Sequence, residues 1–131
     1  MGRPGATPRS LGLLTAAPES VSHARSFVRD ALVTANVGTD VVERATLLVS
    51  ELVTNTVVHT LSSSVEITVR SSPVVRVEVR DWSDGLPEMR STGSRDPWGH
   101  GLSIVDALAS RWGVNPLPDG KAVWIELDPS D

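Results

Sequence analysis

The segment from Val41 to Val58 constrains the fold of this chain most, because its apolar and small residues recur at intervals of three and four. Residues with that spacing lie on one face of an α-helix and form the stripe that packs against a core. The positions that share this face are Val42, Ala45, Val49, Leu52 and Thr56. We therefore predict a long helix from Asp40 to about Thr60 with one buried face.

Two polar residues, Glu51 and Asn55, lie at the flank of this apolar stripe. They are four residues apart, so they lie one above the other on the same face of the predicted helix. A carboxylate and a carboxamide at this place are more than a helix needs for solubility. The two side chains are therefore either solvated or directed into a polar cavity, and the helix pattern alone leaves both open.

Length and composition favour one domain without a basic surface. The chain has 131 residues, of which 40% are hydrophobic, which suits a single core over residues 10–128 and a loose tail over residues 1–9. A formal net charge of -4 argues against direct binding of nucleic acid. No apolar run approaches the roughly 20 residues that cross a bilayer, and no signal peptide is visible. The lack of such a run predicts no association with a membrane. The absence of cysteine fits a cytoplasmic location, which we therefore expect.

The remaining elements can be placed from periodicity and turn residues. In chain order we predict a strand at 10–15, a helix after Pro18 that ends near Asn36, paired strands at 65–69 and 75–79, a loop at 81–99, a helix from Gly101, and strands at 112–114 and 122–127 joined by a turn at 115–120. This order predicts an α+β fold, a two-layer sandwich in which about three helices cover one face of a mixed, mostly antiparallel sheet.

Three places in this pattern could carry chemistry: the Glu51/Asn55 pair, Asp81 at the end of a strand, and Gly99-His100-Gly101 at a helix start. Each has an ordinary structural explanation, since an Asp after a strand often begins a turn and a Gly-x-Gly often gives a flexible helix entry. Free N–H groups at a helix start can also bind an anion such as phosphate. The segment between Asp81 and Gly99 is longer than most structureless loops, which favours a lid or a binding loop.

The order and spacing of these motifs resemble the GHKL ATPase superfamily, which includes gyrase, histidine kinases and mismatch-repair ATPases. The resemblance is greatest to its small actinobacterial branch, which is related to the anti-sigma factor serine kinases. The segments that carry it are Glu51–Asn55, Val79–Ser83, Gly99–Val105, Arg111–Val114 and Gly120–Trp124. Because they span nearly the whole chain, the resemblance implies the Bergerat ATP-binding fold with ATP and Mg²⁺ as ligands.

The resemblance also implies a role for each matching polar residue. Asn55 corresponds to the asparagine whose side-chain oxygen holds the Mg²⁺ that bridges the nucleotide phosphates. Glu51 corresponds to the acidic residue that acts as general base or orients the attacking group. Asp81 corresponds to the aspartate that accepts a hydrogen bond from the adenine amino group.

The glycine-rich motifs match the two glycine boxes of the superfamily, with one departure. Gly99, His100, Gly101 and Leu102 correspond to the second glycine box, where the absence of Cβ lets the backbone approach phosphate. The first glycine box runs from Asp81 to Gly85, with Ser83 in place of the usual first glycine. Arg95 or His100 is the cation that the resemblance would place near phosphate charge, although lid arginines are as often solvated.

The function that the resemblance implies is that of an ATP-binding, anti-sigma-factor-like serine/threonine protein kinase. Its partners would be a sigma factor, an anti-sigma factor antagonist, or both, and the family also suggests a homodimer. Two alternatives stay open: a catalytically inactive, nucleotide-dependent protein-binding regulator, and a histidine kinase-like ATPase domain that acts in trans.

Overall fold

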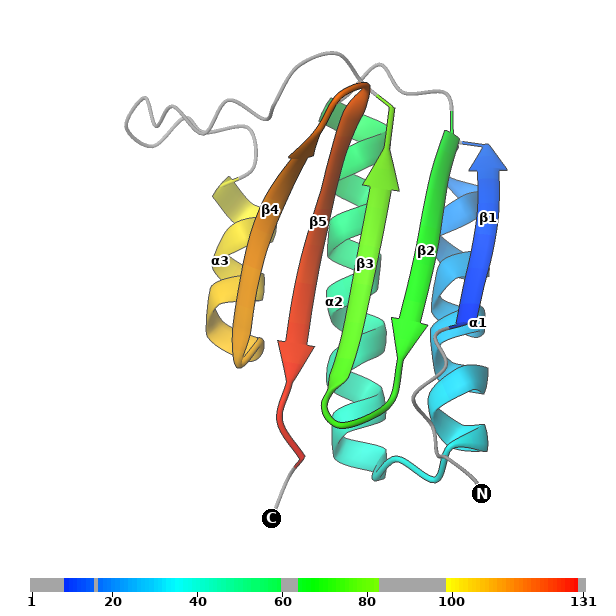
Figure 1. Cartoon of the computed structure of the whole chain (residues 1–131), viewed down its shortest axis with the longest axis vertical. Helices are drawn as coiled ribbons and strands as arrows, with labels where there is room; N and C mark the ends of the chain where they lie inside the picture. Colours follow the sequence, from blue (N-terminus) through cyan, green and yellow to red (C-terminus); the bar gives the residue numbers. More distant parts are fainter. Residues whose placement is uncertain (1–8, 16, 60–63, 83–98, 130–131) are drawn as a thin grey trace.

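Three helices cover one face of a five-stranded sheet in the computed structural model, which describes residues 9–15, 17–59, 64–82 and 99–129 (Figure 1). The elements in chain order are β1 (Arg9–Thr15), α1 (Glu19–Thr34), α2 (Thr39–His59), β2 (Ser64–Arg70), β3 (Val75–Asp81), α3 (Gly99–Leu108), β4 (Arg111–Leu117) and β5 (Gly120–Leu127). The predicted α+β sandwich is therefore confirmed. No helix in these ranges is both long and apolar enough to cross a membrane.

The sheet has the strand order β1-β2-β3-β5-β4, and each of its four pairings is antiparallel. β5, the last strand in the chain, therefore lies between β3 and β4. Its register sets Asp81 at the end of β3 opposite Lys121 near the start of β5. This pairing joins two residues that are far apart in the sequence.

The core lies between the sheet and the helices. β2 and β3 alternate in burial along their length, so one face of each strand packs against the helices and the other stays partly exposed. The predicted stripe of α2 is confirmed, because Val42, Ala45, Val49 and Leu52 are each at most 3% exposed. α2 packs against α1 and α3 as well as against β3 and β5, so it is the central helix of this layer.

The structure corrects the prediction for the last two strands. A turn was predicted at 115–120, but β4 continues to Leu117 and only residues 118 and 119 lie between the two strands. Pro116 pairs with Lys121 in this ladder. A proline is tolerated there because β4 is an edge strand, where one row of N–H groups has no strand to bind. Two smaller shifts also occur, since β1 begins at Arg9 and α3 begins at Gly99.

Candidate functional site

The rotation of α2 about its axis decides where Glu51 and Asn55 lie. Leu52 and Thr56 are at most 2% exposed and face the core. Each residue of an α-helix is turned by about 100° from the previous one, so Asn55 lies at the edge of the buried face, where it is 6% exposed. Glu51, one turn earlier, is half-buried. The structure therefore separates a buried carboxamide from a carboxylate that solvent can reach.

Asn55 carries an unsatisfied polar atom. Its side-chain nitrogen Nδ2 is buried and has no hydrogen-bond partner within the ranges that the structure describes. Leaving a buried amide N–H unpaired costs about 1–3 kcal/mol, and most buried polar atoms in folded proteins are paired. A carboxamide retained in this position is therefore suited to a ligand that offers it an acceptor.

Asp81 is buried at the end of β3, on the helix-covered side of the sheet. The alternation of this strand puts it in the same row as Val77 and Val79, and it is only 1% exposed. Its Oδ2 atom accepts a hydrogen bond from Lys121 Nζ over 2.6 Å. Lys121 is itself fully buried. The predicted adenine-binding residue is thus half of a buried ion pair.

Sequence motifs did not predict the role of Lys121, but its position in the alternation of β5 indicates that it is buried. Lys121 alternates with Val123, Ile125 and Leu127 along β5, and all four residues lie in the buried class. In a strand, residues two apart share one face. A lysine in phase with three buried apolar residues is therefore expected on the core side, where it needs an anionic partner.

The β4–β5 hairpin fixes the backbone of β3 next to Asp81. A Cβ atom at Gly120 would collide with the carbonyl oxygen of Asp81 and approach the Cα of Trp82, so only glycine permits this contact. On the other face, Arg80 donates a hydrogen bond to Asp119 over 2.7 Å. The Arg80 guanidinium also lies 4.4 Å from the ring centroid of Trp82. The contacts of Asp119 and Gly120 therefore connect the end of β3 to the β4–β5 hairpin.

The described site residues gather at one end of the molecule. α2 and β3 both end there, and β5 begins there (Figure 1). Gly99, His100, Gly101 and Leu102 form the start of α3, and α3 packs against α2. The side chains of these four residues lie outside the described part of the structure, as do residues 83–98 with Ser83, Gly85 and Arg95.

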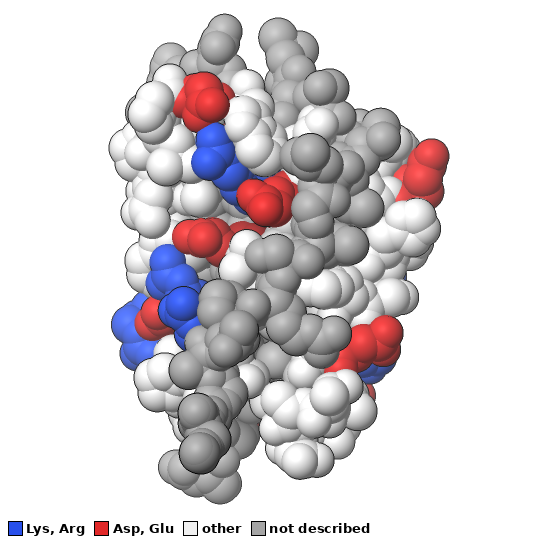
Figure 2. Space-filling model, turned by 45° about the vertical axis from the view of Figure 1, so that its right-hand side comes forward, with Lys and Arg blue, Asp and Glu red and all other residues white. Residues whose placement is uncertain are grey.

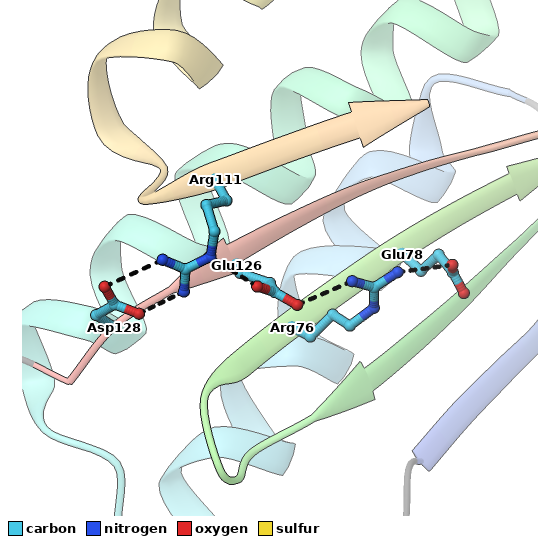
Figure 3. A network of polar contacts seen from close by, with 5 residues as sticks. All are labelled: Arg76, Glu78, Arg111, Glu126 and Asp128. Atoms are coloured by element: carbon cyan, nitrogen blue, oxygen red, sulfur yellow. Dashed lines mark hydrogen bonds and ion pairs between the residues drawn. The ribbon is translucent and has the colours of Figure 1, made fainter. Parts of the chain in front are cut away.

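A second polar cluster lies on the uncovered face of the sheet. Glu126 accepts hydrogen bonds from Arg111 and Arg76, each over 2.9 Å, and Arg111 also binds Asp128 (Figure 3). The hydrogen bond from Arg111 lowers the pKa of Glu126 below its ordinary value, with a smaller contribution from Arg76, and burial opposes both. Basic and acidic side chains lie next to one another on the sheet side rather than separating by sign (Figure 2). This cluster links β3, β4 and β5 on the face of the sheet opposite the helices.

Two further features of the described residues bear on where a ligand binds. They include no group of three or more His, Asp and Glu side chains placed to hold a metal ion. A cavity of about 310 Å³ exists, but its lining comes from the start of α2, the β2–β3 turn and the end of β5, including Val41, Val75 and Leu127. That cavity is at the opposite end of α2 from Asn55, and its lining is mainly apolar, with Thr39, Asp40 and Ser71 as its polar side chains.

Comparison with known proteins shows the family of this chain. Residues 14–127 match the family model of the histidine kinase-like ATPase domain. The chain therefore belongs to the histidine kinase-like ATPase domain family. A search of curated protein sequences found no significant match.

Two solved structures are similar to this fold. One holds the RsbU and RsbW domains of a Mycobacterium tuberculosis protein, with a TM-score of 0.72 and 18% identity over 96% of this chain and 33% of that one. The other is a blue-light activated histidine kinase from Erythrobacter litoralis, with a TM-score of 0.52 and 26% identity over 72% of this chain and 32% of that one. The chain thus spans about a third of each of these longer proteins.

Proposed function

We propose that this protein binds ATP with Mg²⁺ and transfers the γ-phosphoryl group to a serine or threonine of a partner protein. The observation that carries the proposal is the buried carboxamide of Asn55, whose Nδ2 atom has no hydrogen-bond partner among the described residues, one helical turn from a half-buried Glu51. Membership in the histidine kinase-like ATPase domain family supports the choice of nucleotide.

The residues of the site divide the binding of ATP between them in this proposal. Asn55 would offer its side-chain oxygen to Mg²⁺ and its N–H to a phosphate oxygen, which suits an ion that keeps several waters and few protein ligands. Asp81 would accept a hydrogen bond from the adenine amino group, and Ser83 and Gly85 of the first glycine box would contribute to nucleotide binding. Gly99, Gly101 and Leu102 place backbone N–H groups at the phosphates, and Arg95 and His100 supply positive charge.

Glu51 is proposed as the general base of the transfer. The bond between the γ-phosphorus and its bridging oxygen breaks, and a bond forms between that phosphorus and the hydroxyl oxygen of the substrate. The Glu51 carboxylate takes the hydroxyl proton, and ADP leaves with the electron pair of the broken bond. A half-buried position suits this role, because the carboxylate must be reached by a second protein.

The proposed partner is an anti-sigma factor antagonist, and the protein would regulate a sigma factor through it. The motif resemblance to anti-sigma factor serine kinases and the fold likeness to a structure with an RsbW domain support this choice. A net charge of -4 and the mixture of both signs on the sheet side give no support to direct binding of nucleic acid.

The proposal is tested by incubating the protein with labelled ATP and a candidate antagonist. We expect label on serine or threonine, and we expect Glu51→Gln to slow the transfer by about 10²–10⁴-fold, the usual contribution of a general base. Glu43→Gln is the matched control, because Glu43 is an exposed glutamate earlier on the same helix. Its transfer rate should equal that of the wild type.

Other outcomes would select the alternatives. Acid-labile label on histidine would indicate a histidine kinase-like domain that acts in trans. The similarity to the structure of a histidine kinase supports this alternative hypothesis. If Glu51→Gln regulates the partner as the wild type does, ATP serves only to set a binding surface. Absence of phosphoserine and phosphothreonine on every partner tested would refute the kinase proposal.

A further inference from the structure

Among the described residues, Asp81 and Lys121 are the only charged residues that are buried. Their atoms Oδ2 and Nζ are 2.6 Å apart, and both side chains are 1% exposed. Lys121 is also the single lysine among the twelve Lys and Arg residues of the chain. The mechanism proposed above gives it no task, although its partner is the residue proposed to bind adenine.

We propose that Lys121 is a positioning and specificity-determining residue for the nucleotide base. This inference rests on the proposed function, and it concerns how Asp81 distinguishes a 6-amino purine from a 6-oxo purine. Lys121 donates a hydrogen bond to Oδ2 of Asp81 and so fixes the orientation of the carboxylate. A carboxylate paired in this way only accepts hydrogen bonds. Such a group pairs with the amino group of adenine and repels the carbonyl oxygen of guanine or hypoxanthine.

The physical basis is the cost of an isolated charge in the core. An ionised carboxylate that is taken out of water without a counter-ion is so costly that it takes up a proton instead. A protonated carboxyl has an O–H donor as well as an acceptor. Without Lys121, Asp81 would therefore accept a 6-oxo group as readily as a 6-amino group, and the site would lose its selectivity.

The fold holds this pair in place before any ligand arrives. Asp81 and Lys121 are direct partners in the β3–β5 ladder, so the sheet fixes the separation of their backbones. The close contact of Gly120 with the backbone of Asp81 and Trp82 holds the same point from the other strand. A group that is already oriented loses little entropy when it binds, which is the general advantage of preorganisation.

A purely structural ion pair would behave differently. Buried ion pairs often contribute little net stability, and apolar replacement of both partners can be neutral. Such a pair affects how well the protein folds, and through folding it changes the affinity for every nucleotide by the same factor. Only a residue that sets base specificity changes the ratio of the affinities for a 6-amino and a 6-oxo purine nucleotide.

The test measures that ratio by calorimetry, with Mg·ATP and Mg·ITP as probes. ITP carries a 6-oxo group in place of the 6-amino group of ATP, and its N1 atom bears a hydrogen where N1 of adenine is an acceptor. We expect the wild type to favour ATP by about tenfold to a hundredfold, which corresponds to one hydrogen bond to a charged group. In Lys121→Met the preference should fall to about threefold or less.

Arg76→Met is the matched control, because Arg76 also forms an ion pair across the β3–β5 ladder, with Glu126. Its preference for ATP should equal that of the wild type. Lys121→Gln serves as the second variant if Lys121→Met does not fold, since glutamine keeps a hydrogen-bond donor and removes the charge. The same loss of preference is expected.

Three results would overturn the inference in distinguishable ways. If the wild type favours ATP and both Lys121 variants keep that preference, Lys121 does not set specificity, while the proposed function stands. If the wild type binds neither nucleotide, the proposed function and this inference both fail. A lower affinity for both nucleotides at an unchanged ratio would also count against the inference, because it would show a structural role alone.

Discussion

At the scale of single residues, Asn36 fixes how the chain passes from α1 into α2. It is the only non-glycine residue with a positive φ in the described ranges, at 62°. Its N–H binds the carbonyl of Val33, and the N–H of Val37 binds the carbonyl of Leu32, each over 3.0 Å. These two bonds form a Schellman motif, in which the left-handed residue is usually glycine. The motif ends α1 at Thr34 and directs the chain into the helix that carries Asn55.

Asn36→Gly should therefore stabilise the protein. Glycine reaches positive φ without a Cβ penalty, so the free energy of unfolding should rise by up to about 1 kcal/mol. Asn36→Val should lower it by about 1–2 kcal/mol, because a β-branched residue resists this conformation. Urea denaturation measures both. A stabilising effect of valine would show that the turn does not keep this conformation in solution.

At the scale of elements, ion pairs on the uncovered face of the sheet connect the edge strand β4 to the inner strands β5 and β3. Arg111 on β4 and Arg76 on β3 both bind Glu126 on β5, so one carboxylate connects three strands. The Arg76 guanidinium also lies 4.5 Å from the ring centroid of Trp124. The ring of Trp124 in turn covers Gly113, where an added Cβ would approach it to 2.7 Å. These contacts hold the hairpin whose tip supports Asp81.

Glu126→Gln should lower the free energy of unfolding at neutral pH and leave it unchanged at low pH. The folded state lowers the pKa of Glu126, chiefly through the hydrogen bond from Arg111. A carboxylate of this kind contributes stability above its unfolded pKa of about 4.3, and that stability is lost as the pH falls through the lower folded pKa.

The measurement is the free energy of unfolding of both proteins between pH 7 and pH 2. We expect a difference of at most about 1 kcal/mol at pH 7, since Glu126 is partly exposed, and no difference at the acid end. Glu66→Gln on the same face is the control, and it should show a smaller difference at neutral pH. A constant difference at all pH values would contradict the assigned cause.

At the scale of the whole molecule, the proposed nucleotide site occupies one end of the sheet, where α2, β3, β5 and the start of α3 meet (Figure 1). Among the described residues, the buried polar side chains are the hydroxyl residues Ser20, Thr46 and Thr56 and, at this end, Asn55, Asp81 and Lys121. Proteins often retain such groups at a cost in stability where a ligand needs them. The stability of the molecule should therefore respond to the ligand.

Mg·ATP at about 100 times its dissociation constant should stabilise the folded protein by about 2.7 kcal/mol. For a domain of this size, that corresponds to a rise in Tm of roughly 5–15 °C. Asn55→Ala should lose most of this rise at the same ATP concentration. Without ATP it should be about as stable as the wild type, because Nδ2 of Asn55 has no partner among the described residues.

Thermal melting with and without Mg·ATP provides the measurement. Asn115→Ala is the control, since Asn115 is an exposed asparagine on the edge strand β4. Its Tm should rise with ATP as much as that of the wild type. An equal rise in Asn55→Ala would show that Asn55 holds neither metal nor phosphate.

Local periodicity was sufficient to predict the fold class and most of the elements. The stripe from Val42 to Thr56 gives the central helix, and alternation gives β2 and β3, because side chains repeat every 3.6 residues in a helix and every two in a strand. The motifs around Glu51, Asn55 and Asp81 were also visible, since each is a short segment with a fixed spacing. The roles assigned to these residues stay predictions.

Tertiary structure alone decided what surrounds these residues. β5 enters the sheet between β3 and β4, so Asp81 meets a lysine 40 positions away in the sequence. The same pairing extends β4 through Pro116, which the local sequence marked as part of a turn. No local pattern encodes the order of strands, because the order depends on which distant segments bury their apolar faces together. The sequence alone determined the helix that carries Asn55 and Glu51, and the long-range pairing of β3 with β5 decided that Asp81 is buried as half of an ion pair.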